Sequence, residues 1–423
     1  MFTGPEITSV SPAELRAFPW QGAITDSLPP DVRATIDPDI QRIQDEARVL
    51  VRARALERLQ PIRLSARRAS DFVRVNRVEG LSVGGGLTVR VAPRIFVSGR
   101  ARVGSDDHRQ GKGMANVRWE QPSGTRFEVF GGRDLSDIGD QVERSSVFNS
   151  IGAQEFASDA TDPFSLATRG ARLFRRIRGM DVSLTATQEQ HKQLEVHSSP
   201  SSGTYLPTPE IDPLRGARLS IGIDRPLTAW RGPGLLRVEA RGNVLRTTDP
   251  GLFEDMLGPG LTSYRASAGV EHRTSVGSTN VILRENAAAL FGGTRPLQEL
   301  VYFGGPLSLP GYALHEVAGT YGSATRLELQ VPVPFIPIPL GRFGRIPGQA
   351  RLAPYVSGAV VGGSVACTAV YGRCPALTEG FYPSAGVALL TIFDLLRVDV
   401  ARGLKNGRWT FNVDVSRDFW SIL

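Results

Sequence analysis

The chain has 423 residues, of which 41% are hydrophobic and 22% charged, with 46 glycines and 29 prolines. It is too apolar to be disordered and too rich in glycine for a helical bundle, so its composition favours an all-β fold. The net charge of +7 could suit nucleic acid, but the basic residues mostly alternate with apolar ones along the chain, and we expect no nucleic acid partner.

The N-terminal part precedes any strand pattern. Residues 1–30 lack the basic stretch and the apolar stretch of a secretory signal peptide, which counts against export as written unless the start is misplaced or the precursor is longer. Residues 39–59 place apolar side chains at helical spacing among Arg, Gln, Asp and Glu, and so predict an amphipathic helix. We expect this helix to lie in the periplasm. The alternative is that it lies on the membrane surface, with its arginines on anionic headgroups.

From about residue 80 to the end, short segments of alternating apolar and polar residues recur between turn residues, as in β-strands. In residues 325–335, for example, Leu327, Leu329 and Val331 alternate with Arg326, Glu328 and Gln330. A charged face on strand after strand is hard to bury in a sandwich core, whereas a membrane barrel presents one face to lipid and the other to a wet lumen. No stretch approaches the roughly 18 apolar residues of a spanning helix. The sequence therefore predicts a transmembrane antiparallel β-barrel.

The connections between strands supply an independent test. Outer-membrane barrels alternate short periplasmic turns with longer extracellular loops, and this sequence does the same, apart from a Pro-rich stretch at 336–348 that is long for a periplasmic turn. Fifteen strands can be counted from Leu81, and loop parity requires one more near Phe72 to Val78, so we expect about sixteen. We therefore divide the chain into a periplasmic N-terminal segment with an amphipathic helix, 1–70, and an outer-membrane barrel, 71–423.

Two segments resemble the Omp85 superfamily of outer-membrane barrels. Tyr302 to Tyr312 reads YFGGPLSLPGY and is followed by five strands, and in that family a long loop with an Arg-Gly-Tyr or Arg-Gly-Phe tip folds into the lumen before the last five strands. Arg74 to Gly86, RVNRVEGLSVGGG, is similar to the start of surface-antigen-like members that lack the repeated periplasmic POTRA domains. The resemblance covers about residues 74–423 and implies that loop 292–321 folds into the lumen.

The resemblance also implies a set of site residues. The family's loop-tip Arg aligns with Pro310, and the Asp of its facing-strand FxDxG motif aligns with Ser357, so the lumenal ion pair of the family is lost from both sides. Losing both partners is physically coherent, because one charge left alone would be costly. The loop motif then consists of Gly304, Gly305, Leu309, Pro310, Gly311 and Tyr312, and the facing-strand motif of Tyr355, Ser357 and Gly358.

Two further features concern the C-terminal quarter. Cys367 and Cys374 lie close together in a Gly-containing loop, which predicts a small disulfide in an oxidising compartment, with two free thiols as the alternative. The last strand has the aromatic alternation expected of a barrel-closing strand that assembly machinery reads, although the match is partial because Phe419 is not at the chain end. Its aromatic residues are Trp409, Phe411, Phe419 and Trp420.

No motif indicates catalysis or cofactor binding. The five histidines form no metal-ligand pair, and no nucleophile elbow, Walker A motif or dinucleotide fingerprint is present, so we expect no enzyme, no cofactor and no metal. Two weaker alternatives are a barrel phospholipase using His272 and a calcium site; an interfacial histidine and a solvated loop are preferred. The calcium ligands would be Asp134, Asp137, Asp140 and Glu143.

These observations lead to ranked functional hypotheses. The first is an Omp85-like outer-membrane barrel in envelope assembly, outer-membrane protein assembly or transport, with outer-membrane lipid and other outer-membrane or periplasmic proteins as partners. The second is a structural or accessory barrel that anchors a larger complex without insertase activity. The third, a passive porin, requires an open lumen and is disfavoured if loop 292–321 fills it.

The barrel prediction can be checked on a gel. Detergent-extracted protein should migrate faster unboiled than boiled, because a barrel resists sodium dodecyl sulfate until it is heated. Unchanged mobility together with a soluble protein would point instead to a soluble all-β protein with a charged surface.

Overall fold

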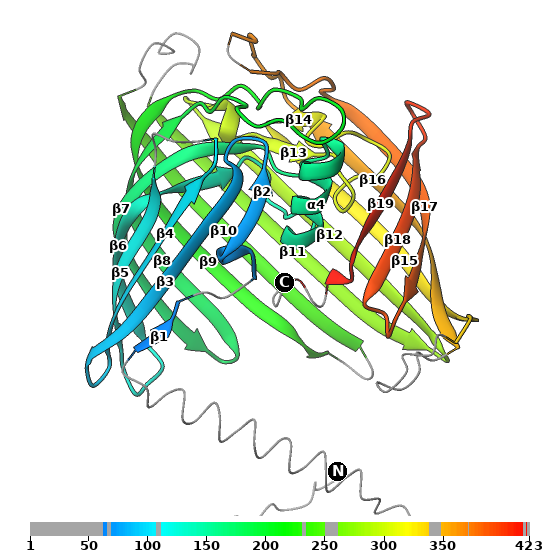
Figure 1. Cartoon of the computed structure of the whole chain (residues 1–423), viewed down its shortest axis with the longest axis horizontal. Helices are drawn as coiled ribbons and strands as arrows, with labels where there is room; N and C mark the ends of the chain where they lie inside the picture. Colours follow the sequence, from blue (N-terminus) through cyan, green and yellow to red (C-terminus); the bar gives the residue numbers. More distant parts are fainter. Residues whose placement is uncertain are drawn as a thin grey trace, which may run out of the picture. The chain divides into compact units, whose positions relative to one another are not determined.

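The computed structural model describes residues 62–65, 69–106, 111–230, 234–249, 261–337, 348–370, 372–417 and 420. The predicted helix at 39–59 and Phe419 lie outside these residues. Within them, nearly all strands belong to one antiparallel sheet that curves around a single helix, α4 (Ser146–Phe156), as Figure 1 shows. The all-β fold class predicted from the sequence, with one large antiparallel sheet, is confirmed.

The sheet has sixteen strand positions, as predicted. The first position is shared by two short strands, β1 (Ile62–Leu64) and β2 (Val73–Asn76), which both pair with β3. The other fifteen follow in chain order, each antiparallel to the one before. They are β3 (Gly80–Ala92), β4 (Ile95–Gly104), β5 (Lys112–Glu120), β6 (Arg126–Asp137), β7 (Pro163–Ile177), β8 (Met180–Lys192), β9 (Leu214–Trp230), β10 (Gly234–Asp249), β11 (Thr262–Val276), β12 (Thr279–Gly292), β15 (Tyr321–Pro334), β16 (Gln349–Gly362), β17 (Gly380–Thr391), β18 (Leu396–Gly403) and β19 (Trp409–Val415).

The first strand position is interrupted, which explains its weak signal in the sequence. Leu64 lies opposite Leu87 and Val73 lies opposite Val83, so the edge strand carries more residues than its partner across this stretch. Part of the excess forms a 3-10 turn, η2 (Ala69–Asp71). Pairing with β3 therefore begins at Ile62, upstream of the predicted barrel boundary at residue 71.

The strands present an apolar face to the outside. Large hydrophobic side chains such as Leu173, Ile221 and Val356 are exposed, and their number far exceeds what a water-soluble surface tolerates. Cross-strand register lines them up in continuous rows around the sheet. One such row comprises Val129, Ala171, Ala186, Leu219, Val244, Tyr264 and Phe291. This face is suited to lipid.

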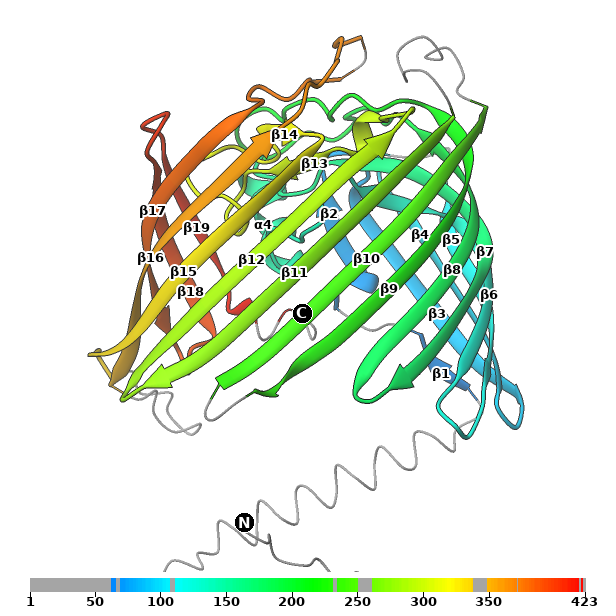
Figure 2. The same cartoon turned by 180° about the vertical axis from the view of Figure 1, so that it is seen from behind.

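The connections alternate in length as predicted. Short links join β3 to β4, β5 to β6, β7 to β8, β9 to β10, β11 to β12 and β17 to β18, whereas long loops emerge at the opposite rim (Figure 2). At the turn between β7 and β8, Arg178 and Gly179 both adopt positive φ, which a tight two-residue hairpin requires. The described helices include none long and apolar enough to cross a membrane.

A charge test separates the two faces of a strand. Ile221→Arg on the outward face of β9 should lower the free energy of unfolding by about 2–4 kcal/mol, because a guanidinium would have to enter hydrocarbon. Ser220→Arg, one residue earlier and on the opposite face, should cost less than about 1 kcal/mol. Denaturant titration of the protein in lipid vesicles measures both. Equal costs would contradict the assignment of the outward face to lipid.

Candidate functional site: a loop-filled lumen and an unpaired seam

The long connection between β12 and β15 packs against the concave face of the sheet. It contains a 3-10 turn, η4 (Leu297–Glu299), and a small hairpin of β13 (Val301–Phe303) and β14 (Val317–Gly319), which both figures show inside the curve of the sheet. Its apolar side chains are buried in two clusters shared with the wall strands. The first cluster joins Val301, Phe303, Leu309, Tyr312 and Val317 to Ala288, Ala324, Ala359, Val361 and Tyr382.

The predicted loop motif lies in this buried hairpin. Gly304 and Gly305 both have φ of +123°, which side-chain-bearing residues rarely adopt, and a Cβ on Gly305 would meet the Glu143 carboxylate. Gly311, also at positive φ, lies against the backbone of Gly403, and its N–H donates to Thr410 Oγ1 at 3.0 Å. The glycines thus allow the close approach of the loop to the end of the barrel wall.

The rest of the motif is buried as well. Leu309 and Tyr312 are almost completely enclosed, and Pro310 is buried between them. Tyr312 donates its hydroxyl to the carbonyl of Pro383 at 3.1 Å and meets the ring of Tyr382 edge-on. The tip is therefore anchored through backbone contacts and aromatic packing.

The facing-strand motif lies on β16. Ser357 is buried, and its hydroxyl has no hydrogen-bond partner among the described residues. Gly358 lies opposite Thr325 and Pro383, whereas Tyr355 donates its hydroxyl to Asp399 on β18. The structure therefore does not join Pro310 and Ser357 by any polar interaction, and the charges of this wall lie elsewhere.

A buried charge network occupies that wall, and sequence reasoning did not find its pairing. Arg326 on β15 lies 3.6 Å from the centre of the Tyr355 ring, pairs with Glu328 at 3.0 Å and Asp399 at 3.5 Å, and reaches the loop carbonyl of Pro306. Arg397 on β18 binds the same two carboxylates at 2.9 and 2.8 Å. The alternation predicted that these residues share the inner face, but not which partners they choose.

A polar cavity of about 290 Å³ adjoins this network on the inner side of the sheet. Its lining includes Arg284, Arg326, Arg397, Asp399 and Asp414. The described lumen is thus filled by the loop in one region and holds a small charged cavity in another.

Four loops at the long-loop rim are joined through one buried carboxylate, that of Asp162. We call Asp162 and its partners Arg77, His315 and Arg373 the Asp162 hub. Asp162, before β7, pairs with Arg77 between β2 and β3, with Arg373 between β16 and β17, and with His315 Nδ1 at 2.8 Å. Burial opposes the charge of Asp162, but the hydrogen bond from His315 and the two arginines outweigh it and hold the pKa of Asp162 well below its usual range. Burial likewise opposes a charged His315, yet Asp162 raises its pKa.

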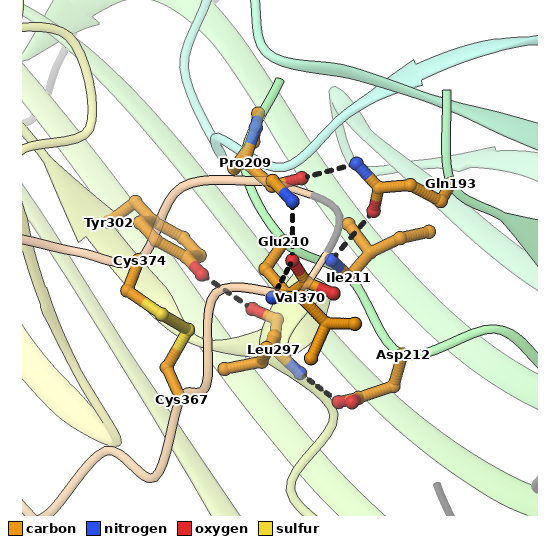
Figure 3. The surroundings of a disulfide bond; sticks show 11 residues. Gln193, Pro209, Glu210, Ile211, Asp212, Leu297, Tyr302, Cys367, Val370 and Cys374 are labelled. Carbon is orange, nitrogen blue, oxygen red and sulfur yellow. Dashed lines mark hydrogen bonds between the residues drawn. A yellow bond between two sulfur atoms is a disulfide. The ribbon is translucent and has the colours of Figure 1, made fainter. Parts of the chain in front are cut away.

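The predicted disulfide between Cys367 and Cys374 is present in the loop between β16 and β17 (Figure 3). This loop is one of those joined at Asp162, which together we call the cap. Glu210, from the loop between β8 and β9, accepts hydrogen bonds from the N–H groups of Val370 at 3.2 Å and Gly372 at 2.6 Å, inside the small disulfide ring. Asp212 accepts from the N–H of Leu297 at 2.7 Å, so the same loop also holds the lumenal connection.

The first and last strands do not pair. No hydrogen-bond ladder between β19 and β1 or β2 is found in the described part of the chain, and the sheet is not closed. Figure 1 shows α4 between β2 and β19. No helix was predicted between β6 and β7, so α4 was missed; it lies at the seam between β2 and β19.

Helix α4 is attached to both edges of the seam. Before its first turn, Arg144 donates to Asn412 at 3.0 and 2.8 Å, and Ser145 binds Asp414 through its N–H at 2.8 Å and through its hydroxyl. On the other side, Ser150 accepts a hydrogen bond from the N–H of Val75 at 3.1 Å. The helix and the two residues before it thus link β2 to β19 through hydrogen bonds that each involve at least one side chain.

The weaker alternatives have defined places too. Asp134 pairs with Arg100 and Arg102, Asp140 with Arg265, and Glu143 accepts backbone N–H groups of the loop, so these carboxylates do not converge. No group of three or more metal-ligand side chains occurs among the described residues. His272 lies between Leu236 and Leu283 in the cross-strand register. Of the terminal aromatics, Trp409 and Phe411 are exposed on β19, and Trp420 donates to the carbonyl of Val415 at 2.9 Å.

Comparison with known proteins finds likeness in structure alone. No protein-family model and no curated protein sequence matches the chain. Among solved structures it is similar to BamA from Haemophilus ducreyi lacking POTRA domains 1–3, with a TM-score of 0.48 and 16% identity over 81% of this chain and 69% of that one. It is also similar to CdiB from Escherichia coli, with a TM-score of 0.42 and 13% identity over 81% and 59%. Both are Omp85 superfamily barrels.

A third similar structure is OccK10 (OpdN) from Pseudomonas aeruginosa, with a TM-score of 0.32 and 15% identity over 84% of this chain and 96% of that one. All three likenesses concern the fold. The chain spans about 69% of the BamA chain and 59% of the CdiB chain.

The cap should depend on Asp162. Asp162→Asn leaves Arg77 and Arg373 without their shared buried counter-charge and should cost about 3–5 kcal/mol, whereas Asp224→Asn, in a half-exposed pair with Arg237, should cost less than about 1 kcal/mol. Because the pKa of Asp162 is lowered, its stabilisation is complete above the usual aspartate range and is lost as pH falls through the lowered pKa. Both effects are measured by the temperature at which half of the protein loses its faster-migrating band, recorded from pH 7 to pH 2. An Asp162→Asn variant as stable as wild type would contradict the view that Asp162 holds the loops together.

Proposed function

We propose that the protein is an Omp85-like outer-membrane barrel that acts in outer-membrane assembly or transport, and that its working site is the seam between β2 and β19. The observation that carries the proposal is that these two edges have no backbone ladder between them. They are linked instead by Ser150 of α4, which accepts from the Val75 N–H, and by Ser145 just before α4, whose N–H donates to Asp414. An edge strand with free N–H and C=O groups is a template for an added strand. When α4 moves aside, a strand of another outer-membrane protein could pair there.

The packed lumen supports the proposal over a passive porin. A porin needs a continuous water-filled path, whereas here loop 292–321 forms buried apolar clusters with the wall, and four connections meet at the Asp162 hub. Opening such a path would expose these clusters to water. A route at the seam requires instead that the hydrogen bonds of α4 and of the residues before it be released.

The motifs of the loop and the last five strands also support an Omp85-like role. The departures at Pro310 and Ser357 favour the second candidate, an accessory barrel without insertase activity. In that case α4 would hold the seam permanently, and the Arg326, Glu328, Arg397 and Asp399 network would serve to stiffen the wall.

A reversible lock tests the proposal. In Ser145→Cys/Asp414→Cys, an oxidised bond would tie α4 to β19, and the native cysteines are already paired with each other. We expect the locked protein to lose most of its ability to speed folding of a client barrel into liposomes, and to recover it on reduction. Wild type treated with the same reductant controls for the loss of Cys367–Cys374.

The result separates the two candidates. Full activity in the locked state would contradict a working seam. If neither wild type nor the reduced variant speeds folding, while the protein co-purifies with a membrane complex at fixed stoichiometry, the accessory role replaces the proposal.

A further inference from the structure

Five basic residues gather on the outward face of five neighbouring strands, near the rim from which the long loops emerge. They are Arg133 on β6, Arg169 on β7, Lys192 on β8, Arg215 on β9 and Arg246 on β10. Figure 2 shows these strands side by side in one wall. We call these five residues the cationic rim.

Register fixes the outward orientation of the cationic rim. Ala171 and Leu219 belong to the outward apolar row described above. Arg169 lies two residues before Ala171 on β7 and therefore also points outward. Ala217 lies two residues before Leu219 on β9 and pairs with Arg246, which therefore points outward too. One more step of two residues reaches Arg133 and Arg215, which lie opposite Ala167 and Gln190 respectively. Because side chains two apart on a strand share a face, the five cations continue the lipid-facing surface just beyond its apolar part.

The outward rows that hold the cationic rim contain few carboxylates. Arg215 has Asp249 at 4.0 Å, and Arg169 donates to the Gln188 amide at 2.8 Å. Among the described strand residues of these rows, Asp249 is the only carboxylate. Lys192, Arg215 and Arg246 are exposed, so their charges are available to a molecule in the surrounding membrane.

The strands that follow β10 around the sheet have a different rim. Toward the long loops, the outward faces of β11, β12, β15, β17 and β19 carry aromatic side chains, all exposed, namely Tyr264, Phe291, Tyr321, Phe381 and Trp409. The basic residue beside them, Arg402, lies over the Trp409 ring. Aromatic rings suit the membrane–water interface in general, so a run of outward cations on the consecutive strands β6–β10 indicates a specific requirement there.

From this placement we infer that the cationic rim binds the headgroup of a phosphate-bearing anionic lipid in the leaflet on the long-loop side. The lipid's chains would lie on the apolar row below, and its phosphates would accept charge-assisted hydrogen bonds from the guanidinium groups. At roughly 4.8 Å per strand, the cluster spans about 19 Å, wide enough to contact more than one phosphate. The inference requires only the barrel fold and is independent of the assembly role.

Lipid A, which carries two phosphates, is a suitable probe. Full-length protein in nanodiscs of phosphatidylcholine with a minor fraction of lipid A should retain lipid A through delipidation, counted by native mass spectrometry. Arg169→Gln/Lys192→Gln/Arg246→Gln should lower its affinity about fivefold for each cation removed. In nanodiscs of phosphatidylcholine alone the variant should keep the heat-modifiability of wild type.

The matched control removes the same charge from the inner face of the same wall. Arg172→Gln/Arg237→Gln/Arg241→Gln should retain lipid A like wild type, because these side chains alternate with the outward ones. Equal loss in both triple variants, or no loss in the first, would overturn the inference. Millimolar inorganic phosphate should not displace lipid A; displacement that depends on the same three residues would assign the site to a free anion and overturn the lipid assignment.

Discussion

In a bilayer, each backbone N–H and C=O that faces hydrocarbon must find a partner inside the protein, and every other feature of this chain accommodates that requirement. Fifteen strands satisfy it by antiparallel pairing in register. The difficulty is concentrated at the two ends of the sheet, where β2 and β19 have no strand between them among the described residues. Helix α4, whose own backbone is bonded internally, lies between them. Its Ser150 accepts from the Val75 N–H of β2, and Arg144 and Ser145 before it bind side chains of β19.

This arrangement couples the seam to the lumen. The segment that leads into α4 also carries Glu143, which accepts hydrogen bonds from the N–H groups of Leu307 and Ser308 in the lumenal loop, and burial raises the pKa of this carboxyl. A displacement of α4 would therefore act on the loop as well. The Asp162 hub adds the connections around Arg77 and Arg373 to the same assembly. The seam, the lumenal loop and the cap are therefore connected to one another through hydrogen bonds and ion pairs.

The sequence allowed the barrel to be predicted because its signals are local. Alternation of residue types along each strand and alternation of loop lengths together predicted the sixteen strand positions. The disulfide was predicted from the closeness of Cys367 and Cys374 in one loop. The first strand was poorly marked because β1 and β2 are short and separated by η2. Helix α4 could not be predicted, since its partners Asn412 and Asp414 lie far away in the sequence. The same is true of Arg326, whose inward direction follows from alternation but whose partners Asp399 and Pro306 come from another strand and from the lumenal loop.

The Asp162 hub also bears on how the barrel reaches its final form. Arg77, His315 and Arg373 come from three connections that are distant in the chain, and all must arrive before Asp162 has its full set of counter-charges. Such long-range contacts form late, because the loops between them must close first. A sheet with one hairpin out of register would bring the wrong residue to the hub and leave a buried carboxylate uncompensated. The ion pairs of the cap can therefore form completely only when most of the wall is correctly assembled, so they stabilise the correct strand register over a shifted one.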